Sequence, residues 1–349
     1  MALENVSKRF VKSIDFAERL ANVLGANYRE QVVRAVDEVS FTIEKGEVLG
    51  LVGESGCGKS TLGRIVAGVL AASDGTVRWH GKTTDELKGD ERRRAQLAVQ
   101  MIFQDPFASL NPRLTVADIV GEAPRFHGLV GGAKEQKEHV AEALRRVGLD
   151  PTYAERYPHQ FSGGQRQRIG IARALALNPR LILADEPVSA LDVSIQAQIL
   201  NLLRDLQREL DLTYLFIAHD LAVIKYISDR VAVMYLGVIV EVANSNEIYE
   251  EPLHPYTQAL MSAIPIPDPS VEESRRRIIL SGDVPSPDKE RHGCYFYDRC
   301  PKRMFKCKTN VPRLQEVRKD HYAACFLYFE PGDQRSEERR VGKECATGC

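Results

Sequence analysis

Short, continuous apolar runs alternate with longer amphipathic stretches along much of this sequence. Runs without a charged position before their last residue occur at 48–52, 181–185 and 214–218, and they are typical of parallel strands buried on both faces. Helical periodicity occurs at 62–70, 169–177 and 195–210. Strand–helix–strand repeats form a parallel sheet covered by helices, and ligands bind at the carboxyl ends of its strands. The sequence therefore predicts an α/β fold with its site at that edge.

Other patterns surround this core. Strands are predicted at 4–10, 32–43, 76–81 and 99–106, the last of which stops at a proline. The strand at 32–43 alternates apolar and polar positions, with Val36, Val39, Phe41 and Ile43 as the apolar ones, and is predicted to be exposed. Residues 11–30 have a weak helical period and resemble an insertion. The charged stretch 88–94 predicts a solvated helix. Residues 116–157 are predicted to be largely helical.

Composition limits the class of protein. The hydrophobic fraction of 44% and the charged fraction of 27% are those of a globular protein, and the net charge of −1 gives no support for nucleic-acid binding. No run approaches the roughly 18 apolar residues that span a bilayer, and residues 1–10 lack the apolar segment of a signal peptide. With 349 residues, two domains are expected. Seven prolines between Pro252 and Pro287 predict a largely irregular region and a domain boundary near residue 250.

A glycine-rich loop follows the first buried strand. Residues 53–61 fit G-x-x-x-x-G-K-[ST], the phosphate-binding loop (P-loop) of nucleoside triphosphatases. Glycines let successive N–H groups surround a phosphate chain, and the following helix adds its positive dipole end. Lys59 is expected to reach the β- and γ-phosphates, Ser60 to bind Mg²⁺ and Thr61 to contact the α-phosphate. The predicted nucleotide-binding residues of this loop are Gly53, Ser55, Gly56, Cys57, Gly58, Lys59, Ser60 and Thr61.

Two carboxylates end the second buried run. Asp185 is placed to hold Mg²⁺, directly or through water, and Glu186 to polarise the attacking water as the general base. Phosphoryl transfer depends on positioning and charge neutralisation, so one carboxylate on the metal side and one on the water side suffice. The alternative is an Asp–Glu pair that only caps a helix.

A second anion-binding pattern lies about 110 residues after the P-loop. Ser162, Gly163, Gly164 and Gln165 precede a predicted helix, whose N-terminus attracts anions. Together with the P-loop, Gln104, Leu181–Glu186, Ser189–Asp192 and His219, this motif resembles the ATP-binding subunits of ABC transporters over residues 1 to about 330. Phe161 stands where that family most often has Leu, which is a mild departure.

The resemblance implies a dimer with two ATP molecules between its subunits. Ser162–Gln165 would contact the γ-phosphate held by the partner's P-loop, and Asp192 would lie at the dimer seam. Gln104 would sense Mg²⁺ and the attacking water, and His219 would contact the γ-phosphate. Phe10 would stack on adenine, with Tyr28 as its rival and a core phenylalanine as the plain alternative. Residues 106–160 would form an inserted helical subdomain that docks on membrane subunits, within an ATPase domain at 1–250.

The C-terminal segment narrows the resemblance. Glu251–Thr257, followed by Leu260–Pro265, is similar to the extension of dipeptide and oligopeptide importer ATPases, and residues 59–64 resemble the second of their two ATPase subunits. The implied partners are a second ATPase subunit in a heterodimer, two membrane-spanning permease subunits and an outer peptide-binding protein. This chain itself would lie at the cytoplasmic face of the inner membrane. A nickel or glutathione importer and a non-transport ATPase of this family stay open as alternatives. His254 and Tyr256 are predicted only to pack.

Four cysteines lie within about 30 residues near the end of the chain. Only Cys57 precedes them, and this uneven distribution argues against a secreted protein held by disulfides. In a reducing cytosol, four such cysteines favour a metal site over disulfides. Four thiolates can hold a [4Fe–4S] cluster or Zn²⁺, although the spacing is not that of a paired C-x₂-C zinc ribbon. Similar tails in the importer group carry [4Fe–4S] clusters, so the cluster is favoured, within a C-terminal domain at 251–330. The predicted ligands are Cys294, Cys300, Cys307 and Cys325.

Residues 335–349 form a separate, highly charged tail. Their sequence resembles a translated sequencing adapter, so the hypothesis is that they do not belong to the natural protein and that Cys345 and Cys349 are not ligands. A charged, disordered tail is the alternative.

Overall fold

The computed structural model describes residues 1–12, 22, 30–84, 86–264, 277–280, 282, 285–286 and 292–332. Within these residues, the larger sheet has eight strands in the order β11-β12-β10-β9-β3-β8-β7-β6. The strands from β9 to β6 in this order pair in parallel, and β10, β12 and β11 continue the sheet antiparallel. Their bounds are β3 (Val48–Val52), β6 (Val99–Ile102), β7 (Leu181–Asp185), β8 (Thr213–Ile217), β9 (Arg230–Tyr235), β10 (Val238–Asn244), β11 (Gln315–Arg318) and β12 (His321–Ala323).

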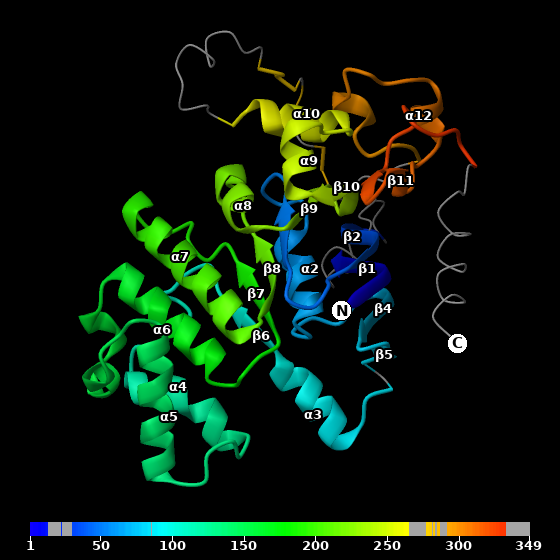
Figure 1. Cartoon of the computed structure of the whole chain (residues 1–349). Helices are drawn as coiled ribbons and strands as arrows, with labels where there is room; N and C mark the ends of the chain where they lie inside the picture. The colour runs from blue at the N-terminus through cyan, green and yellow to red at the C-terminus, as the bar shows by residue number, and fades with distance from the viewer. Residues whose placement is uncertain are drawn as a thin grey trace, which may run out of the picture.

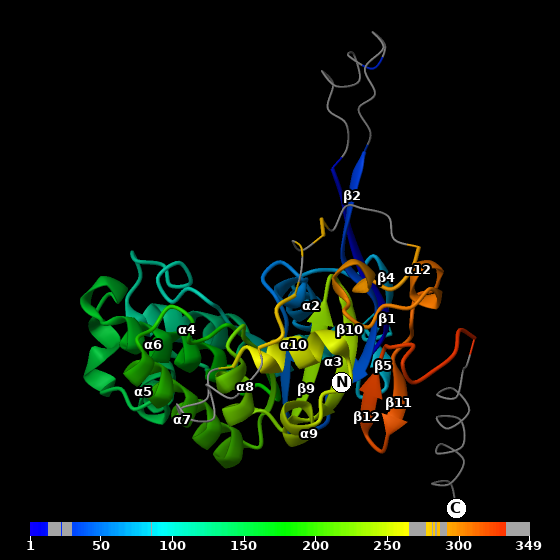
Figure 2. The ribbon, with the colours of Figure 1, turned by 90° about the horizontal axis from the view of Figure 1, so that it is seen from above.

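A smaller antiparallel sheet has the strand order β2-β1-β4-β5. Figure 2 shows its β1–β2 ribbon projecting beyond the body of the molecule. The strand was predicted to be exposed, but Val36, Val39 and Phe41 of β2 are all buried, because the smaller sheet packs on the core beside α2. The strands are β1 (Ala2–Lys12), β2 (Gln31–Thr42), β4 (Asp74–Trp79) and β5 (Lys82–Thr83).

The helices form two groups around the larger sheet. In Figure 1, α4 to α7 gather beside the end of the sheet that carries β6, whereas α9, α10 and α12 lie near β10 and β11. The α-helices are α2 (Lys59–Val66), α3 (Gly89–Ala98), α4 (Val116–Phe126), α5 (Ala133–Arg146), α6 (Gly163–Leu175), α7 (Val193–Leu210), α8 (Leu221–Ile227), α9 (Ser245–Glu250), α10 (Pro255–Ser262) and α12 (Lys306–Thr309). Short 3₁₀ helices are η1 (Pro151–Glu155), η2 (Pro158–Gln160) and η3 (Tyr297–Arg299).

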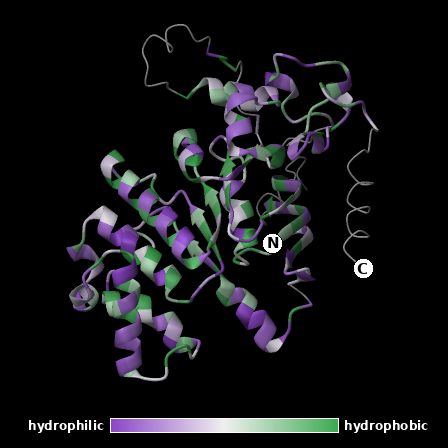
Figure 3. Ribbon diagram, in the orientation of Figure 1, coloured by the Kyte–Doolittle hydropathy of each residue, from purple (hydrophilic) through white to green (hydrophobic). Residues whose placement is uncertain are grey.

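Both faces of the parallel strands are buried, as their continuous apolar sequences require. Successive side chains point to opposite faces, so Val48 and Val52 join the core formed with α4 to α8, whereas Leu49 and Leu51 join the core formed with α2 and the smaller sheet. Figure 3 shows the central strands as hydrophobic and α5 as largely hydrophilic. The predicted solvated helix is also confirmed, because α3 has no buried residue.

The three continuous apolar strands are confirmed to within one residue as β3, β7 and β8. Other bounds differ from the prediction. The strand expected at 99–106 ends at Ile102, where its pairing with β7 ends, and the helix expected at 62–70 begins in the P-loop and ends before Gly68, whose φ is +70°. The supposedly irregular stretch after residue 250 contains α10, with His254 as N-cap and Pro255 in its first turn.

Residues 11 and 12 continue β1 instead of starting a helix. Tyr28, most of the 11–30 insertion and the 335–349 tail lie outside the described residues.

Candidate functional site

The P-loop is built where β3 ends and α2 begins. Gly53 and Gly58 have φ values of +154° and +108°, and a Cβ at either would lie 2.1 Å from a backbone oxygen, of Met234 or Ala35 respectively. Only glycine fits both positions without a shift of the backbone. The Lys59 ammonium lies inside the loop, where it donates to the Gly53 and Glu54 carbonyl oxygens at 2.7 and 2.9 Å.

Ser60 and Asp185 meet at the carboxyl edge of the sheet. The Ser60 hydroxyl donates to Asp185 Oδ1 over 2.9 Å, and Asp185 is 4% exposed. Burial raises the pKa of this carboxyl, while the hydrogen bond from Ser60 acts in the opposite direction. A hydroxyl and a carboxylate side by side are oxygen ligands of the kind that Mg²⁺ prefers.

Glu186 accepts hydrogen bonds from two neighbouring segments. Its Oε2 lies 3.1 Å from Gln104 Nε2 and 3.0 Å from His219 Nδ1. Each of the three residues lies one or two positions beyond a strand, β6, β7 or β8. Glu186 itself has a φ of +47°, and its N–H donates to Ile217 O at 2.9 Å. The structure therefore brings together the three residues predicted as catalytic.

The Ser162–Gln165 motif and Asp192 lie together in another part of the fold. Ser162 caps α6, where its hydroxyl accepts from the Gln165 N–H at 3.3 Å and Gln165 Oε1 accepts from the Ser162 N–H at 3.1 Å. A Cβ on Gly164 would lie 2.6 Å from Ile195, so this motif packs on the start of α7. Asp192 is the exposed N-cap of α7, and its side chain makes no capping hydrogen bond.

Phe10 lies on the projecting β1 strand and is 44% exposed. It pairs with Val33 of β2, two residues from the Ala35 carbonyl that approaches Gly58. Lys8 Nζ lies 5.4 Å from the centre of its ring. Phe10 is therefore not a core residue, and its ring is accessible from solvent near the P-loop.

The four C-terminal cysteines come from one compact segment. The Cys294 N–H donates to the Cys307 carbonyl at 2.8 Å, and all four thiols are free. Burial raises the pKa of Cys294 to about 12 and that of Cys325 to about 11, and the other nearby thiols add to both shifts. Among the residues that the structure describes, no group of three or more His, Cys, Asp or Glu side chains has the arrangement of a metal site.

Sequence reasoning missed two residues that touch the P-loop from the C-terminal segment. The Tyr256 hydroxyl accepts a hydrogen bond from the Glu54 N–H at 3.0 Å. The Arg299 guanidinium donates two hydrogen bonds to the Glu54 carboxylate. Tyr256 had been predicted only to pack. Neither residue belongs to a nucleotide motif, so the sequence offers no local signal for these contacts.

A lysine enclosed by a glycine loop, beside a serine–aspartate pair that suits Mg²⁺, defines a P-loop nucleoside triphosphatase. Comparison with known protein families supports the assignment to this class. The ABC transporter family matches residues 36–189, and the family described as the C-terminal region of oligopeptide/dipeptide transporters matches residues 240–307.

Relatives extend this likeness over most of the chain. The oligopeptide transport ATP-binding protein AppF of Bacillus subtilis (strain 168) is 53% identical over 85% of this chain and 90% of its own length. OppF of Escherichia coli (strain K12), with the same description, is 54% identical over 82% and 85%. The dimeric ATP-binding cassette MJ0796 bound to ADP and Pi has a TM-score of 0.59 and 29% identity, covering 70% of this chain and 98% of its own.

The chain belongs to the ABC transporter ATP-binding proteins, in the group that carries the oligopeptide/dipeptide transporter C-terminal region. Its activity is ATP hydrolysis coupled to transport. Across the described part of the chain, no helix is both long enough and apolar enough to cross a bilayer.

Proposed function

We propose that this chain hydrolyses MgATP to drive a membrane permease that imports dipeptides or oligopeptides. The observation that carries the enzymatic part is the position of Glu186, whose carboxylate is held by Gln104 and His219 beside Asp185. The printed descriptions of AppF and OppF, together with the match at 240–307, support peptides as the transported class.

In this proposal, each residue of the site has a role. Lys59 binds the terminal phosphates, and Ser60 and Asp185 hold Mg²⁺, which neutralises phosphate charge. Glu186 accepts a proton from the attacking water. His219 and Gln104 orient that carboxylate, because both bind the same oxygen atom. The remaining P-loop residues, Gly53, Ser55, Gly56, Cys57, Gly58 and Thr61, surround the phosphate chain.

The site is completed by a second ATPase subunit. Ser162, Gly163, Gly164 and Gln165 are displayed at the exposed start of α6, next to Asp192, where a facing subunit can use them to contact its own nucleotide. MJ0796, which has this fold, is described as a dimer with ADP and Pi. We infer a heterodimer in which this chain is the second of two related ATPases, with Phe10 stacked on adenine.

Permease subunits dock on the helical subdomain, residues 106–160, of the ATPase domain at 1–250. Phe107 and Phe126 expose 59% and 83% of their surface there, although Arg166 lies over the Phe107 ring and His127 contacts the Phe126 ring. Exposed aromatic side chains of this kind are enriched at protein interfaces. Docking of this kind would hold the chain at the cytoplasmic face of the inner membrane, with a peptide-binding protein on the outer side.

Replacing Glu186 with Gln tests the catalytic assignment. The amide keeps the size of the side chain but cannot accept a proton, so ATP binding should persist while turnover falls by at least about 100-fold. Glu91→Gln on the solvated helix α3 is the matched control and should hydrolyse ATP normally. Substantial turnover by Glu186→Gln would defeat the assignment of the general base.

A second proposal concerns the C-terminal domain at 251–330. Cys294, Cys300, Cys307 and Cys325 would hold a [4Fe–4S] cluster, or Zn²⁺ in its place, as a structural centre. Support comes from the backbone hydrogen bond of 2.8 Å that joins Cys294 to Cys307 and from the four free thiols, although the described side chains are not arranged as a metal site. The full chain purified without oxygen should contain about four irons and four sulfides, or one zinc, and Cys57→Ser should keep them. A chain with neither metal would overturn this proposal.

A further inference from the structure

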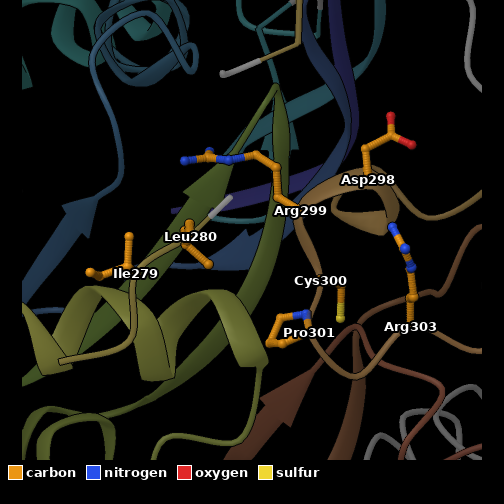
Figure 4. Close-up of a pocket in the computed structure, with 7 residues that line it drawn as sticks. All are labelled: Ile279, Leu280, Asp298, Arg299, Cys300, Pro301 and Arg303. Atoms are coloured by element: carbon orange, nitrogen blue, oxygen red, sulfur yellow. The ribbon is translucent and has the colours of Figure 1, made fainter. Parts of the chain in front are cut away.

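The C-terminal segment reaches the P-loop through a partly buried ion pair. Arg299 closes the 3₁₀ helix η3, between Cys294 and Cys300, and is 9% exposed. Its two terminal nitrogens donate to the two carboxylate oxygens of Glu54 at 2.8 and 3.1 Å. Figure 4 shows the Arg299 side chain extending away from Asp298 and Arg303, with which it lines a cavity of about 200 Å³. A paired arginine–carboxylate contact of this kind fixes both distance and orientation.

Glu54 is held at three points. Besides the ion pair, its N–H donates to the Tyr256 hydroxyl at 3.0 Å, and its carbonyl accepts from Lys59 Nζ at 2.9 Å. Tyr256 is fully buried and packs on Tyr235 and Phe296, with ring centres 4.6 and 5.5 Å away. The P-loop is thus anchored by side chains that lie more than 200 residues further along the chain.

The ion pair also affects the charge of the phosphate site. Glu54 is the second residue of a loop that binds a polyanion, and an unpaired carboxylate there would repel the phosphates. Arg299 neutralises this carboxylate through the two hydrogen bonds between them. Loss of Arg299 alone would be costly, because the partly buried Glu54 carboxylate would keep its charge without a partner.

We propose that Arg299 and Tyr256 are positioning residues that hold the P-loop in its phosphate-binding conformation and mask the charge of Glu54. Through them, the cysteine-bearing segment sets the affinity of the ATPase for the phosphates of its nucleotide. This inference rests on the proposed ATPase function. It adds that the C-terminal region regulates how tightly the P-loop binds the nucleotide.

Arg299→Met in the full-length chain tests the inference, with Arg303→Met as the matched control. Arg303 lines the same cavity but contacts the Tyr297 ring instead of the P-loop. Loss of a charged hydrogen-bonded pair should weaken MgATP binding by about 10- to 100-fold, measured with a fluorescent ATP analogue. The KM for ATP should rise by a similar factor, while kcat changes less than about twofold.

Two further variants separate positioning from mere folding. Arg299→Lys keeps the charge and should retain most of the affinity. Adding Glu54→Gln to Arg299→Met removes the unpaired carboxylate and should restore at least half of the lost affinity on a logarithmic scale. The inference is overturned if Arg299→Met binds ATP as Arg303→Met does, or if the double variant is no better than the single one. Failure of the unaltered chain to bind ATP would instead overturn the proposed function.

Discussion

Glu241 is a buried carboxylate that joins the C-terminal segment to the central sheet. It lies in β10, is 0% exposed, and accepts hydrogen bonds from the Leu253 and His254 N–H groups at 2.7 and 2.8 Å. His321 Nε2 of β12 lies 2.7 Å from the same carboxylate. One side chain therefore holds the start of α10 and the added strand β12. Glu241→Gln is the most informative perturbation of this junction.

The expected loss of stability in Glu241→Gln follows from the number of hydrogen-bond donors that face this side chain. A carboxylate can accept all three hydrogen bonds, whereas glutamine has one acceptor oxygen and an NH₂ group that would face an N–H donor. At least one buried donor then loses its partner, and the contact with His321 loses its charge. The expected cost is about 2–4 kcal/mol in the free energy of opening this region, within the range for broken buried polar pairs.

Hydrogen–deuterium exchange measures that cost locally. At about 1.4 kcal/mol per tenfold change, amides in residues 238–244, 253–254 and 321–323 should exchange about 30- to 700-fold faster in Glu241→Gln. Glu251→Gln breaks an exposed pair with Arg318 and is the matched control, with no measurable change expected. Exchange in Glu241→Gln that equals that of Glu251→Gln would refute the reasoning.

Two other predictions concern pH and loop geometry. Burial lowers the pKa of His254 to about 4, so between about pH 6.5 and 4 the unfolded chain binds a proton that the native state does not, and stability falls as pH falls, by up to about 1.4 kcal/mol per unit. Urea midpoints at pH 6.5, 5.5 and 4.5 should show a smaller loss for His254→Asn, which keeps a capping oxygen for α10; parallel slopes would contradict this. Gly58→Ala should abolish ATP binding, because its Cβ would lie 2.1 Å from Ala35 O, whereas Gly56→Ala has no atom within 4 Å and should bind more weakly but measurably. Equal binding by the two variants would show that the close approach is unimportant.

The central strands and the catalytic cluster could be predicted because their signals are local. Continuous apolar runs locate β3, β7 and β8, and the rule that ligands bind at carboxyl ends brings Lys59, Asp185 and Glu186 to one edge. The addition of Gln104 and His219 needed the family resemblance, since neither residue type is informative by itself. The roles of Ser162 and Asp192 stay predictions, because they concern a facing subunit.

The rest depends on contacts between distant parts of the chain. β11 and β12 have four and three residues, too few for a periodic signal; β12 pairs with β10, and β11 pairs with β12. β9 and α8 were not predicted either, although their residues are apolar. Tyr256 and Arg299 lie 202 and 245 positions after Glu54 in the chain, so no pattern around either residue indicates the contact.

The added strands have a consequence for how the ATPase can be divided. β12 pairs along β10, and the match to the transporter C-terminal region begins at residue 240, inside β10. A fragment that stops near residue 250 would leave the hydrogen-bonding groups of β10 without this neighbour and would uncover the apolar side chains beneath it. Exposed strand edges of this kind recruit other chains. A shortened ATPase would therefore tend to aggregate, because the C-terminal region covers the edge of β10 and keeps the protein in solution.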